Sequence, residues 1–423
     1  MIDSENGKEA ESIENFEEKE EETRKPLIEV RNLKTYFFTE EGIVKAVDGV
    51  SFDIYKNEVL GLVGETGCGK SVTALSILGL VRAPGKIMEG TISLNGKNLV
   101  GLSRKEMRNY RGNKITMIFQ DPLNSLNPVM TVGNQIGEVF LLHQKDRIRD
   151  ILKERRETRR IRMKEVRELQ KKLKDEAERL NAEEINEINE KIESIKEKMK
   201  GAITIKTIVL EEAEKIVNEV GIADARGILK RYPHELSGGM RQRVMIAMAL
   251  TCNPVLLCAD EPTTALDVTI QAQILDLMKD LKDRFQTSIL MITHDLGIIA
   301  DLCDRVAVMY SGNIVEYATA VELFKKPKHP YTQGLIGAIP SIEKRDQKLK
   351  TIRGMVPNLI YPPSGCRFHP RCDFRLEVCD KVKPRFLEIA DKYYIACHLY
   401  DPEYKDSPKY EWEEEEFELS GKV

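Results

Sequence analysis

The sequence predicts an α/β protein in which short buried strands alternate with helices and a long helical segment is inserted in the middle. Two observations carry this prediction. Short apolar runs at residues 27–30, 46–54 and 59–63 are bounded by turn-forming residues, and the last run leads into a loop and a helical pattern after Gly69. From residue 143 to 201 the chain consists almost entirely of helix-forming residues and contains no proline.

Bulk composition narrows the class of protein. The 423 residues, 41% of them hydrophobic, suffice for one large domain with accessory segments. No apolar run reaches the roughly eighteen residues that a membrane span needs, and the N-terminus, rich in Glu and Lys, lacks the apolar core of a secretion signal. The 69 acidic and 65 basic side chains give a net charge of −4, unlike a dedicated nucleic-acid binder. We therefore expect a cytoplasmic protein without a nucleic-acid partner.

Changes in composition divide the chain into segments. Residues 1–25 form an acidic tail with too little apolar surface to fold, so we expect it to be disordered. Residues 26–318 carry the strand and helix patterns of the main domain, interrupted by the helical insertion at 144–201. A Pro- and Cys-containing extension follows at 319–400, and a second acidic tail at 401–423.

The apolar residues of the insertion fall at heptad spacing in two stripes. The stripes are Val166, Leu169, Leu173, Ala177 and Leu180, and then Ile185, Ile188, Ile192, Ile195 and Met199. The register resets at Asn181, which favours an antiparallel helical hairpin. The alternative is a single exposed, charged helix.

A glycine-rich loop with the sequence GETGCGKS follows the apolar run that ends at residue 63. It fits the pattern of loops whose backbone N–H groups hold nucleotide phosphates at a helix N-terminus. Lys70 is expected to reach the β- and γ-phosphates, Ser71 to bind Mg²⁺, and Cys68 to contribute only its backbone. The residues predicted to bind ATP here are Gly64, Glu65, Thr66, Gly67, Cys68, Gly69, Lys70, Ser71 and Val72.

Two carboxylates stand at the end of another apolar run, residues 255–259. Asp260 is expected to hold the Mg²⁺ shell and to bind ATP with the loop, whereas Glu261 is expected to polarise the attacking water. A further apolar run, residues 288–293, ends in His294. Its ring is expected to donate a hydrogen bond to the γ-phosphate.

Residues 236–243, with the sequence LSGGMRQR, form a second small-residue loop before an apolar helix. By the same physics this loop offers a second anion-binding helix N-terminus, so one chain carries two half-sites for phosphate. The order of phosphate loop, LSGG, a strand ending in Asp-Glu and a later His resembles the ATP-binding subunits of ABC transporters. The resemblance covers most of residues 27–318.

This resemblance implies a P-loop NTPase of the ABC type. Its expected parts are a RecA-like α/β core, an antiparallel β subdomain, a helical subdomain that carries the inserted hairpin, and a small C-terminal Cys-rich subdomain. Two subunits would sandwich two MgATP molecules, with the LSGG loop of each completing the other's site. The residues implied to act on the partner's site are Ser237, Gly238, Gly239 and Gln242.

The resemblance also implies roles at the chain's own site. Catalysis falls to Glu261, His294 and Gln120, and Mg²⁺ binding to Ser71, Gln120 and Asp260. Asp267, in the sequence Ala265-Leu266-Asp267, matches the D-loop. Phe37 is expected to stack on adenine, with neighbouring Tyr36 as the alternative.

The C-terminal side resembles the oligopeptide/dipeptide branch of ABC importers. The matching residues are 328–333, 335–340, Gly365-Cys366 and Pro370-Arg371-Cys372. This branch implies an ATPase that lies at the cytoplasmic face of the membrane and powers uptake of di- or oligopeptides. Its expected partners are a second, homologous ATPase subunit, two permease subunits and an external solute-binding protein. Oligosaccharides and nickel are alternative cargoes.

A soluble ABC ATPase of DNA repair or translation is the alternative from another class. A translation factor of this kind would carry two cassettes in one chain, and a repair ATPase a far longer coiled coil between its motifs. A single cassette with an importer-like tail therefore favours the transporter.

Four of the eight cysteines lie in the C-terminal extension with the spacing C-x5-C-x6-C-x17-C. They are Cys366, Cys372, Cys379 and Cys397. Four thiolates can hold an iron–sulfur cluster or Zn²⁺, but the tight cysteine pairs typical of zinc sites are missing from this sequence. Some members of the importer branch resemble this pattern and carry a [4Fe-4S] cluster. We therefore expect a [4Fe-4S] cluster, with Zn²⁺, free thiols or disulfides as alternatives.

Overall fold

The structure is a computed structural model that describes residues 25–121, 125–176, 179–264, 266–338 and 352–410. The predicted N-terminal acidic tail, apart from Lys25, and residues 411–423 of the second tail lie outside the described residues. The chain divides into two compact units: Met1–Asp121 with Asn253–Val423, and Pro122–Cys252. Each unit is considered by itself below.

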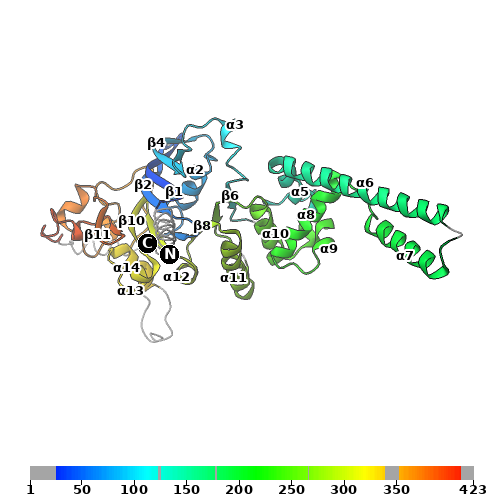
Figure 1. The fold of residues 1–423 in the computed structure, drawn as a ribbon. Coiled ribbons are helices and arrows are strands. Elements are labelled where there is room, and N and C mark those ends of the chain that lie inside the picture. Colours follow the sequence, from blue (N-terminus) through cyan, green and yellow to red (C-terminus); the bar gives the residue numbers. More distant parts are fainter. Residues whose placement is uncertain (1–24, 122–124, 177–178, 265, 339–351, 411–423) are drawn as a thin grey trace, which may run out of the picture. The chain divides into compact units, whose positions relative to one another are not determined.

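The first unit contains a four-stranded antiparallel sheet, which confirms the predicted antiparallel β subdomain (Figure 1). In the order β2-β1-β4-β5, its strands are β2 (Gly42–Ile54), β1 (Ile28–Thr39), β4 (Gly85–Leu94) and β5 (Lys97–Asn98). On β1, Ile28, Val30 and Leu33 are completely buried. Side chains between them are exposed or half-buried, as expected for a sheet with one covered face.

An eight-stranded sheet forms the centre of the same unit, in the order β11-β12-β10-β9-β3-β8-β7-β6. Five neighbouring strands are parallel: β9 (Arg305–Tyr310), β3 (Val59–Val63), β8 (Ser288–Thr293), β7 (Leu256–Asp260) and β6 (Ile115–Ile118). Every residue of β3, β7, β8 and β9 is buried, as in a parallel sheet covered on both faces. The helices of this unit include α2 (Lys70–Ile77), α3 (Arg104–Met107), α11 (Val268–Phe285), α12 (Leu296–Leu302), α13 (Ala320–Lys325) and α14 (Pro330–Gly337).

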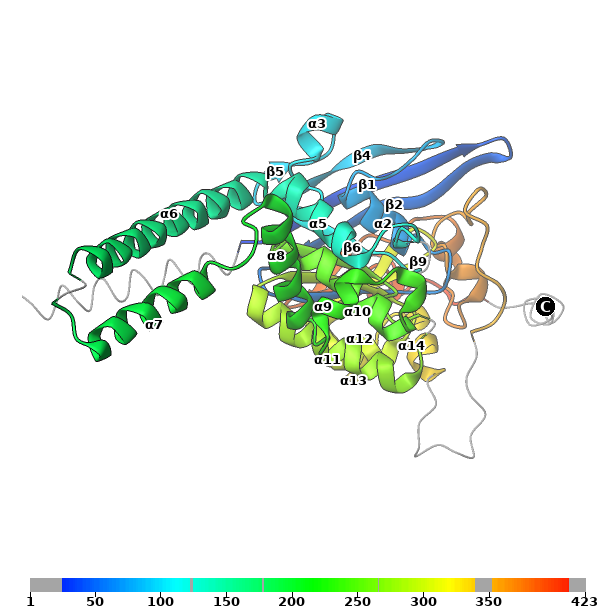
Figure 2. The same ribbon diagram turned by 90° about the vertical axis from the view of Figure 1, so that its right-hand side faces the viewer.

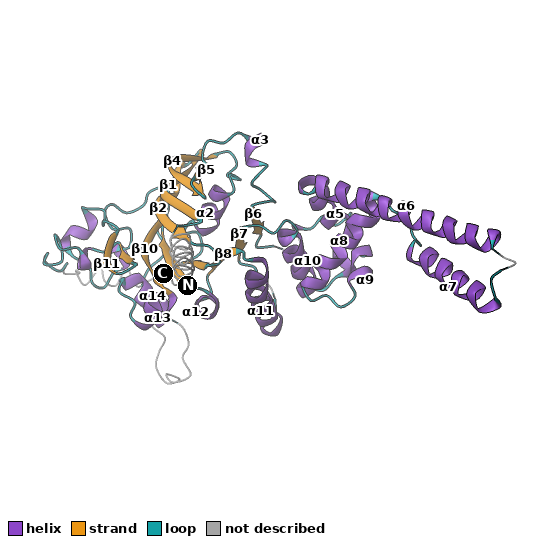
Figure 3. Ribbon diagram, viewed as in Figure 1, coloured by secondary structure: helices purple, strands orange, loops and turns teal. Residues whose placement is uncertain are grey.

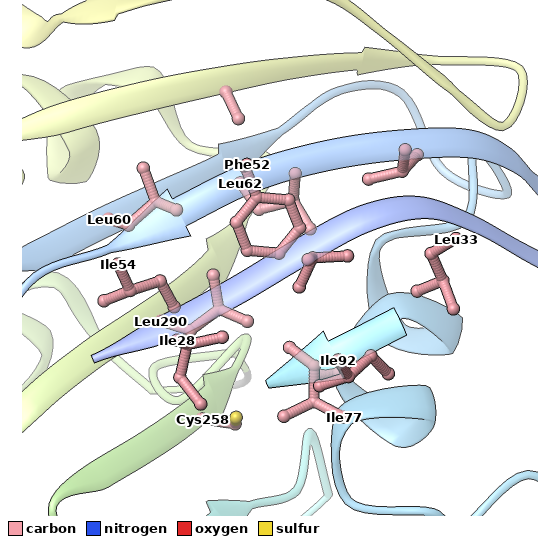
Figure 4. Close-up of a cluster of buried hydrophobic side chains, with 14 of the residues drawn as sticks. Ile28, Leu33, Phe52, Ile54, Leu60, Leu62, Ile77, Ile92, Cys258 and Leu290 are labelled. Atoms are coloured by element: carbon pink, nitrogen blue, oxygen red, sulfur yellow. The ribbon is translucent and has the colours of Figure 1, made fainter. Parts of the chain in front are cut away.

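One hydrophobic core joins the two sheets. Figure 4 shows Ile28 and Phe52 of the antiparallel sheet beside Leu60, Leu290 and Cys258 of the parallel strands. These side chains are at most 2% exposed. The core therefore holds strands β3 and β7 in place. The phosphate loop follows the end of β3, and the two carboxylates stand at the end of β7.

The second unit is helical, as predicted (Figure 3). Its α-helices are α5 (Val132–His143), α6 (Lys145–Asp175), α7 (Ala182–Lys198), α8 (Ile205–Glu219), α9 (Ala225–Lys230) and α10 (Gly238–Leu250). Ile148 and Leu152, in the first turns of α6, are buried. Nearby, Arg147 pairs with Glu212 of α8 at 2.7 Å, so the start of α6 belongs to the body of this unit.

The insertion forms the predicted helical hairpin, with α6 and α7 side by side (Figure 2). Its core consists of Val166, Ile192 and Ile195, packed with Leu169, Leu173, Ile188 and Met199. Asn181, where the register was expected to reset, caps α7 by accepting a hydrogen bond from the Glu184 N–H at 2.9 Å. Ala177, predicted in the first stripe, lies outside the described residues.

The C-terminal Cys-rich segment differs from the prediction because it does not form a separate subdomain in the described structure. Its strand β12 (Tyr393–Ile395) pairs with β10 (Asn313–Thr319), and β11 (Leu387–Ala390) pairs with β12, so both extend the central sheet. Pairing with an existing sheet edge satisfies backbone groups that a small independent subdomain would have to satisfy alone. Among the described residues, no helix is long and apolar enough to cross a membrane.

Candidate nucleotide-binding site

The loop between β3 and α2 has the shape of a phosphate cradle because glycines stand where the backbone requires them. Gly64, Gly67 and Gly69 have φ angles of 153°, 82° and 108°, which L side chains rarely adopt. A Cβ atom at Gly64 would lie 2.1 Å from the Met309 carbonyl oxygen. A Cβ atom at Gly69 would lie 2.2 Å from that of Ala46. Other residues at these two positions would push the loop off its neighbours.

Lys70 lies inside this loop. Its Nζ donates hydrogen bonds to the carbonyl oxygens of Gly64 at 2.7 Å and Glu65 at 3.1 Å. Thr66 and Gly67 are exposed at the tip of the loop, and Val72 is half-buried on α2. The ammonium group is therefore held where backbone N–H groups and the helix N-terminus converge.

Cys68 is fully buried in the hydrophobic core. Burial raises the pKa of its thiol, so the side chain stays neutral. Its Sγ accepts a hydrogen bond from Lys70 Nζ at 3.8 Å, and the expectation that the loop uses only the backbone of this residue stays a prediction.

Ser71 and Asp260 meet at the expected magnesium position. The Ser71 hydroxyl donates to Asp260 Oδ1 at 3.1 Å, and Asp260 is the last residue of β7. Burial raises the pKa of Asp260; the Ser71 hydrogen bond opposes this effect, and the charge of Glu261 adds to it. A carboxylate beside a hydroxyl is a donor set that suits Mg²⁺, and a nearby cation would favour the ionised carboxylate. These residues fit the metal.

Glu261 is the point at which the predicted catalytic residues converge. Its Oε1 lies 3.0 Å from His294 Nδ1, and its Oε2 accepts a hydrogen bond from Gln120 Nε2 at 2.7 Å. Thr264 Oγ1 donates to the same Oε2 at 3.0 Å. Burial acts to raise the pKa of Glu261, but the hydrogen bonds from His294 and Thr264, with the charge of Lys70, bring it below its usual value. The carboxylate is therefore ionised and oriented from three directions.

The backbone of Glu261 is also unusual. Its φ angle of 46° is in the left-handed region, and its N–H donates to the Ile292 carbonyl oxygen of β8 at 2.8 Å. Residues in this region that are not glycine are uncommon and concentrate at functional sites. This left-handed residue comes directly after Asp260, the last residue of β7.

The aromatic residues expected near adenine lie on β1. Phe37 is half-buried, and a Cβ atom on Gly85 of β4 would lie 2.6 Å from its ring. Tyr36 instead donates from its hydroxyl to Asp48 Oδ1 at 2.6 Å. Tyr36 thus has a structural partner, whereas Phe37 presents only an apolar ring.

The predicted LSGG residues begin α10 in the second unit. Ser237 caps the helix by accepting a hydrogen bond from the Met240 N–H at 3.4 Å, and Gly238 and Gly239 are the first helical residues. Gln242 is 1% exposed, and neither polar atom of its side chain has a hydrogen-bond partner among the described residues. A helix N-terminus with small residues suits the predicted contact with phosphate.

The predicted D-loop residue Asp267 begins α11 in the first unit. Its carboxylate accepts a hydrogen bond from the Ile270 N–H at 2.9 Å, so it caps the helix. Ala265, in the same motif, lies outside the described residues.

Three residues at the site were missed by sequence reasoning. Thr264 follows Glu261 by three residues, a spacing that could have suggested a hydrogen bond. Tyr331 and Arg371 belong to the C-terminal motifs that carried the family resemblance, yet both contact Glu65 of the phosphate loop. No local pattern indicates such a contact, because Arg371 and Glu65 are 306 residues apart in sequence.

The expected [4Fe-4S] cluster at Cys366, Cys372, Cys379 and Cys397 is not supported. All four cysteines are free, and burial raises the pKa of each thiol, which favours the protonated form. The Cys379 sulfur accepts a hydrogen bond from the Leu376 N–H at 3.4 Å. In the parts of the chain that the structure describes, no group of three or more Cys, His, Asp or Glu side chains is placed to hold a metal ion. The same observation gives the zinc alternative no support.

Aromatic packing and ion pairs hold the Cys-rich segment against the rest of its unit. Phe368 packs edge-on against Tyr310, with ring centroids 5.2 Å apart, and also contacts Tyr331. Arg367 pairs with Asp48 of β2. The Cys-rich segment is thus fixed by the main sheet and its neighbours.

Comparisons with known proteins show the family to which the chain belongs. A family model described as ABC transporter matches residues 47–264, and a model of the oligopeptide/dipeptide transporter C-terminal region matches residues 315–379. The chain is 45% identical to the oligopeptide transport ATP-binding protein AppD of Bacillus subtilis, over 89% of this chain and 98% of that protein. It is 43% identical to the dipeptide transport ATP-binding protein DppD of the same bacterium, over 89% and 95%.

A solved dimeric structure of the ATP-binding cassette MJ0796 bound to ADP and Pi shares the fold. Its TM-score is 0.50 at 21% identity, over 69% of this chain and 98% of that one. The chain belongs to the ABC transporter family. Within it, the chain falls in the branch that carries the oligopeptide/dipeptide transporter C-terminal region.

Proposed function

We propose that this ABC ATPase powers import of di- or oligopeptides through separate membrane permease subunits. The observation that supports hydrolysis most directly is the ionised Glu261 carboxylate, held by Gln120, His294 and Thr264. Directly before it in sequence, Asp260 accepts a hydrogen bond from Ser71 of the phosphate loop. This arrangement places a base beside a metal-binding carboxylate.

The residues of the chain divide the work of hydrolysis. The loop N–H groups and Lys70 bind the phosphates, while Ser71, Asp260 and Gln120 would hold Mg²⁺. When bound, Mg²⁺ neutralises charge that develops on the phosphate oxygens. Glu261 accepts a hydrogen bond from the attacking water, and His294 orients that carboxylate. MgATP is the only cofactor that we assign.

The peptide cargo is inferred from kinship. AppD and DppD are named as oligopeptide and dipeptide transport proteins, and the C-terminal region of this chain matches that of such transporters. These relatives favour peptides over oligosaccharides or nickel. They also favour a transport motor over a soluble ATPase of DNA repair or translation.

The expected assembly has two ATPase subunits and two permeases at the cytoplasmic face of the membrane, with an external solute-binding protein. The second ATPase subunit is homologous, and the loop of Ser237, Gly238, Gly239 and Gln242 acts on its nucleotide. Pull-down of the chain from detergent-solubilised membranes tests this assembly. We expect a second ATPase and two polytopic proteins. Recovery of ribosomal proteins or DNA in place of polytopic partners would contradict the transporter assignment.

A further inference from the structure

The C-terminal region reaches the phosphate loop through two side chains. Arg371, in the 3-10 turn His369–Arg371, forms a bidentate ion pair with Glu65. The Nη1–Oε2 distance is 2.7 Å and the Nη2–Oε1 distance is 3.0 Å. Tyr331 of α14 accepts a hydrogen bond from the Glu65 backbone N–H at 2.9 Å. Both the carboxylate and the N–H of Glu65 are therefore bound to the C-terminal region.

Arg371 is fixed on several sides, unlike the arginine of an ordinary surface ion pair. Its side chain is 5% exposed, and its Nε donates to the Arg353 carbonyl oxygen at 2.6 Å. Its Nη1 also lies 3.3 Å from the Tyr310 hydroxyl. Burial alone would lower the pKa of Arg371, but the hydrogen bonds to Glu65 and Tyr310 raise it, so the guanidinium stays charged. A planar guanidinium held in this way fixes both oxygens of its partner.

Glu65 also connects this pair to the phosphate-binding lysine. The Glu65 carbonyl oxygen accepts a hydrogen bond from Lys70 Nζ at 3.1 Å. An unpaired carboxylate in a loop that binds a triphosphate would repel it, since like charges at short range disfavour each other. Pairing with Arg371 cancels that charge and holds the loop at the residue that contacts Lys70.

We propose that Arg371 and Tyr331 are positioning residues of the ATP site. Arg371 neutralises Glu65 and, with Tyr331, holds the loop in its phosphate-binding shape. The C-terminal region is then a working part of nucleotide binding in addition to an extension of the sheet. This inference rests on the proposed binding of MgATP by the phosphate loop.

The test measures the dissociation constant for MgATP, and the thermal unfolding midpoint without nucleotide, in the full chain. Arg371→Gln leaves the Glu65 carboxylate unpaired, so we expect MgATP to bind about tenfold more weakly. Glu65→Gln removes the repelling charge together with the pair but also frees the loop, so we expect MgATP to bind about threefold more weakly, a smaller loss than in Arg371→Gln. The double variant should bind MgATP more tightly than Arg371→Gln alone, which a purely structural role of Arg371 does not explain.

Arg385→Gln is the matched control. Arg385 makes a bidentate pair with Asp401, at 2.9 and 2.5 Å, within the same C-terminal region. We expect its MgATP affinity to equal that of the unsubstituted chain. The inference is overturned if Arg371→Gln binds MgATP normally, or if the double variant binds MgATP no more tightly than Arg371→Gln. It is also overturned if Arg385→Gln weakens MgATP binding as much as Arg371→Gln does.

Two further variants keep the test decisive. If Arg371→Gln loses its cooperative unfolding transition, Arg371→Lys takes its place; it keeps the charge but cannot hold both oxygens, and we expect about threefold weaker binding. Unchanged binding in Arg371→Lys would then overturn the inference.

Lys70→Ala tests the proposed function separately. Normal MgATP affinity in that variant contradicts the role of the loop. Weaker MgATP binding in Lys70→Ala, together with normal MgATP binding in Arg371→Gln, contradicts only the role of Arg371.

Discussion

At the scale of single residues, the proposed hydrolysis rests on Glu261. Gln120, Thr264 and His294 come from three different segments, yet each contacts one of its two oxygens. A carboxylate that is ionised and immobile can polarise water without first reorganising. The chemistry therefore depends on this one side chain more than on any other in the described site.

Replacement Glu261→Gln keeps the shape of the side chain but removes the base. We expect MgATP to bind with unchanged affinity and ATP hydrolysis to fall by a factor of about 100 or more. ATP turnover should be measured in an assembly whose other site is silenced, and the variant should accumulate as an ATP-bound dimer. Turnover within about threefold of the unsubstituted protein would remove Glu261 from its role.

Thr264 provides a test of the Glu261 pKa. Its hydrogen bond helps to keep the pKa of Glu261 below its usual value, so the ionised base persists as the pH falls. Thr264→Val removes this bond and should raise that pKa. Because a base is lost as the pH falls through its pKa, the acid limb of the ATPase profile should move to higher pH. An acid limb at the same or lower pH would contradict this assignment.

At the scale of elements, the helical hairpin separates into two parts. Near its start, α6 contributes the buried Ile148 and Leu152 to the helical unit, whereas its outer part, residues 160–175, packs against α7 in the cluster around Val166 and Ile192. Arg159 Nη1 lies 3.1 Å from the Gly201 carbonyl oxygen, so the two ends of the outer part meet there.

This division predicts different outcomes for two deletions. Replacing residues 160–199 with a short Gly/Ser bridge should leave both the unfolding transition and ATP hydrolysis intact, since the lost apolar side chains packed on each other. Deleting residues 147–199 also removes Ile148 and Leu152, each worth about 2–5 kcal/mol when truncated, and should lower the unfolding midpoint markedly. Calorimetry compares the two variants directly. Equal midpoints would show that the start of α6 is dispensable.

Sequence patterns predicted the elements that local rules determine. The glycines of the phosphate loop, the strands before Lys70 and Asp260, and the break between two helices at Asn181 each follow from neighbouring residues. The cysteine spacing predicted a cluster that the described structure does not support, because spacing alone cannot tell whether four thiols are placed to hold a metal. The pair of Arg371 and Glu65 could not be predicted, since contacts over 306 residues depend on how the sheet is assembled.

At the scale of the whole molecule, the catalytic base is connected to the boundary between the two units. Gln120 contacts Glu261, and the second unit begins at Pro122, two residues further along the chain.

Peptide uptake by the reconstituted transporter tests the central claim most directly. Proteoliposomes should contain this chain, its partner ATPase and both permeases, with the solute-binding protein and a labelled oligopeptide on the opposite side of the membrane from MgATP. We expect uptake that requires MgATP and is lost with Glu261→Gln. Hydrolysis of ATP that drives uptake of an oligosaccharide or nickel, and leaves the peptide outside, would contradict the account.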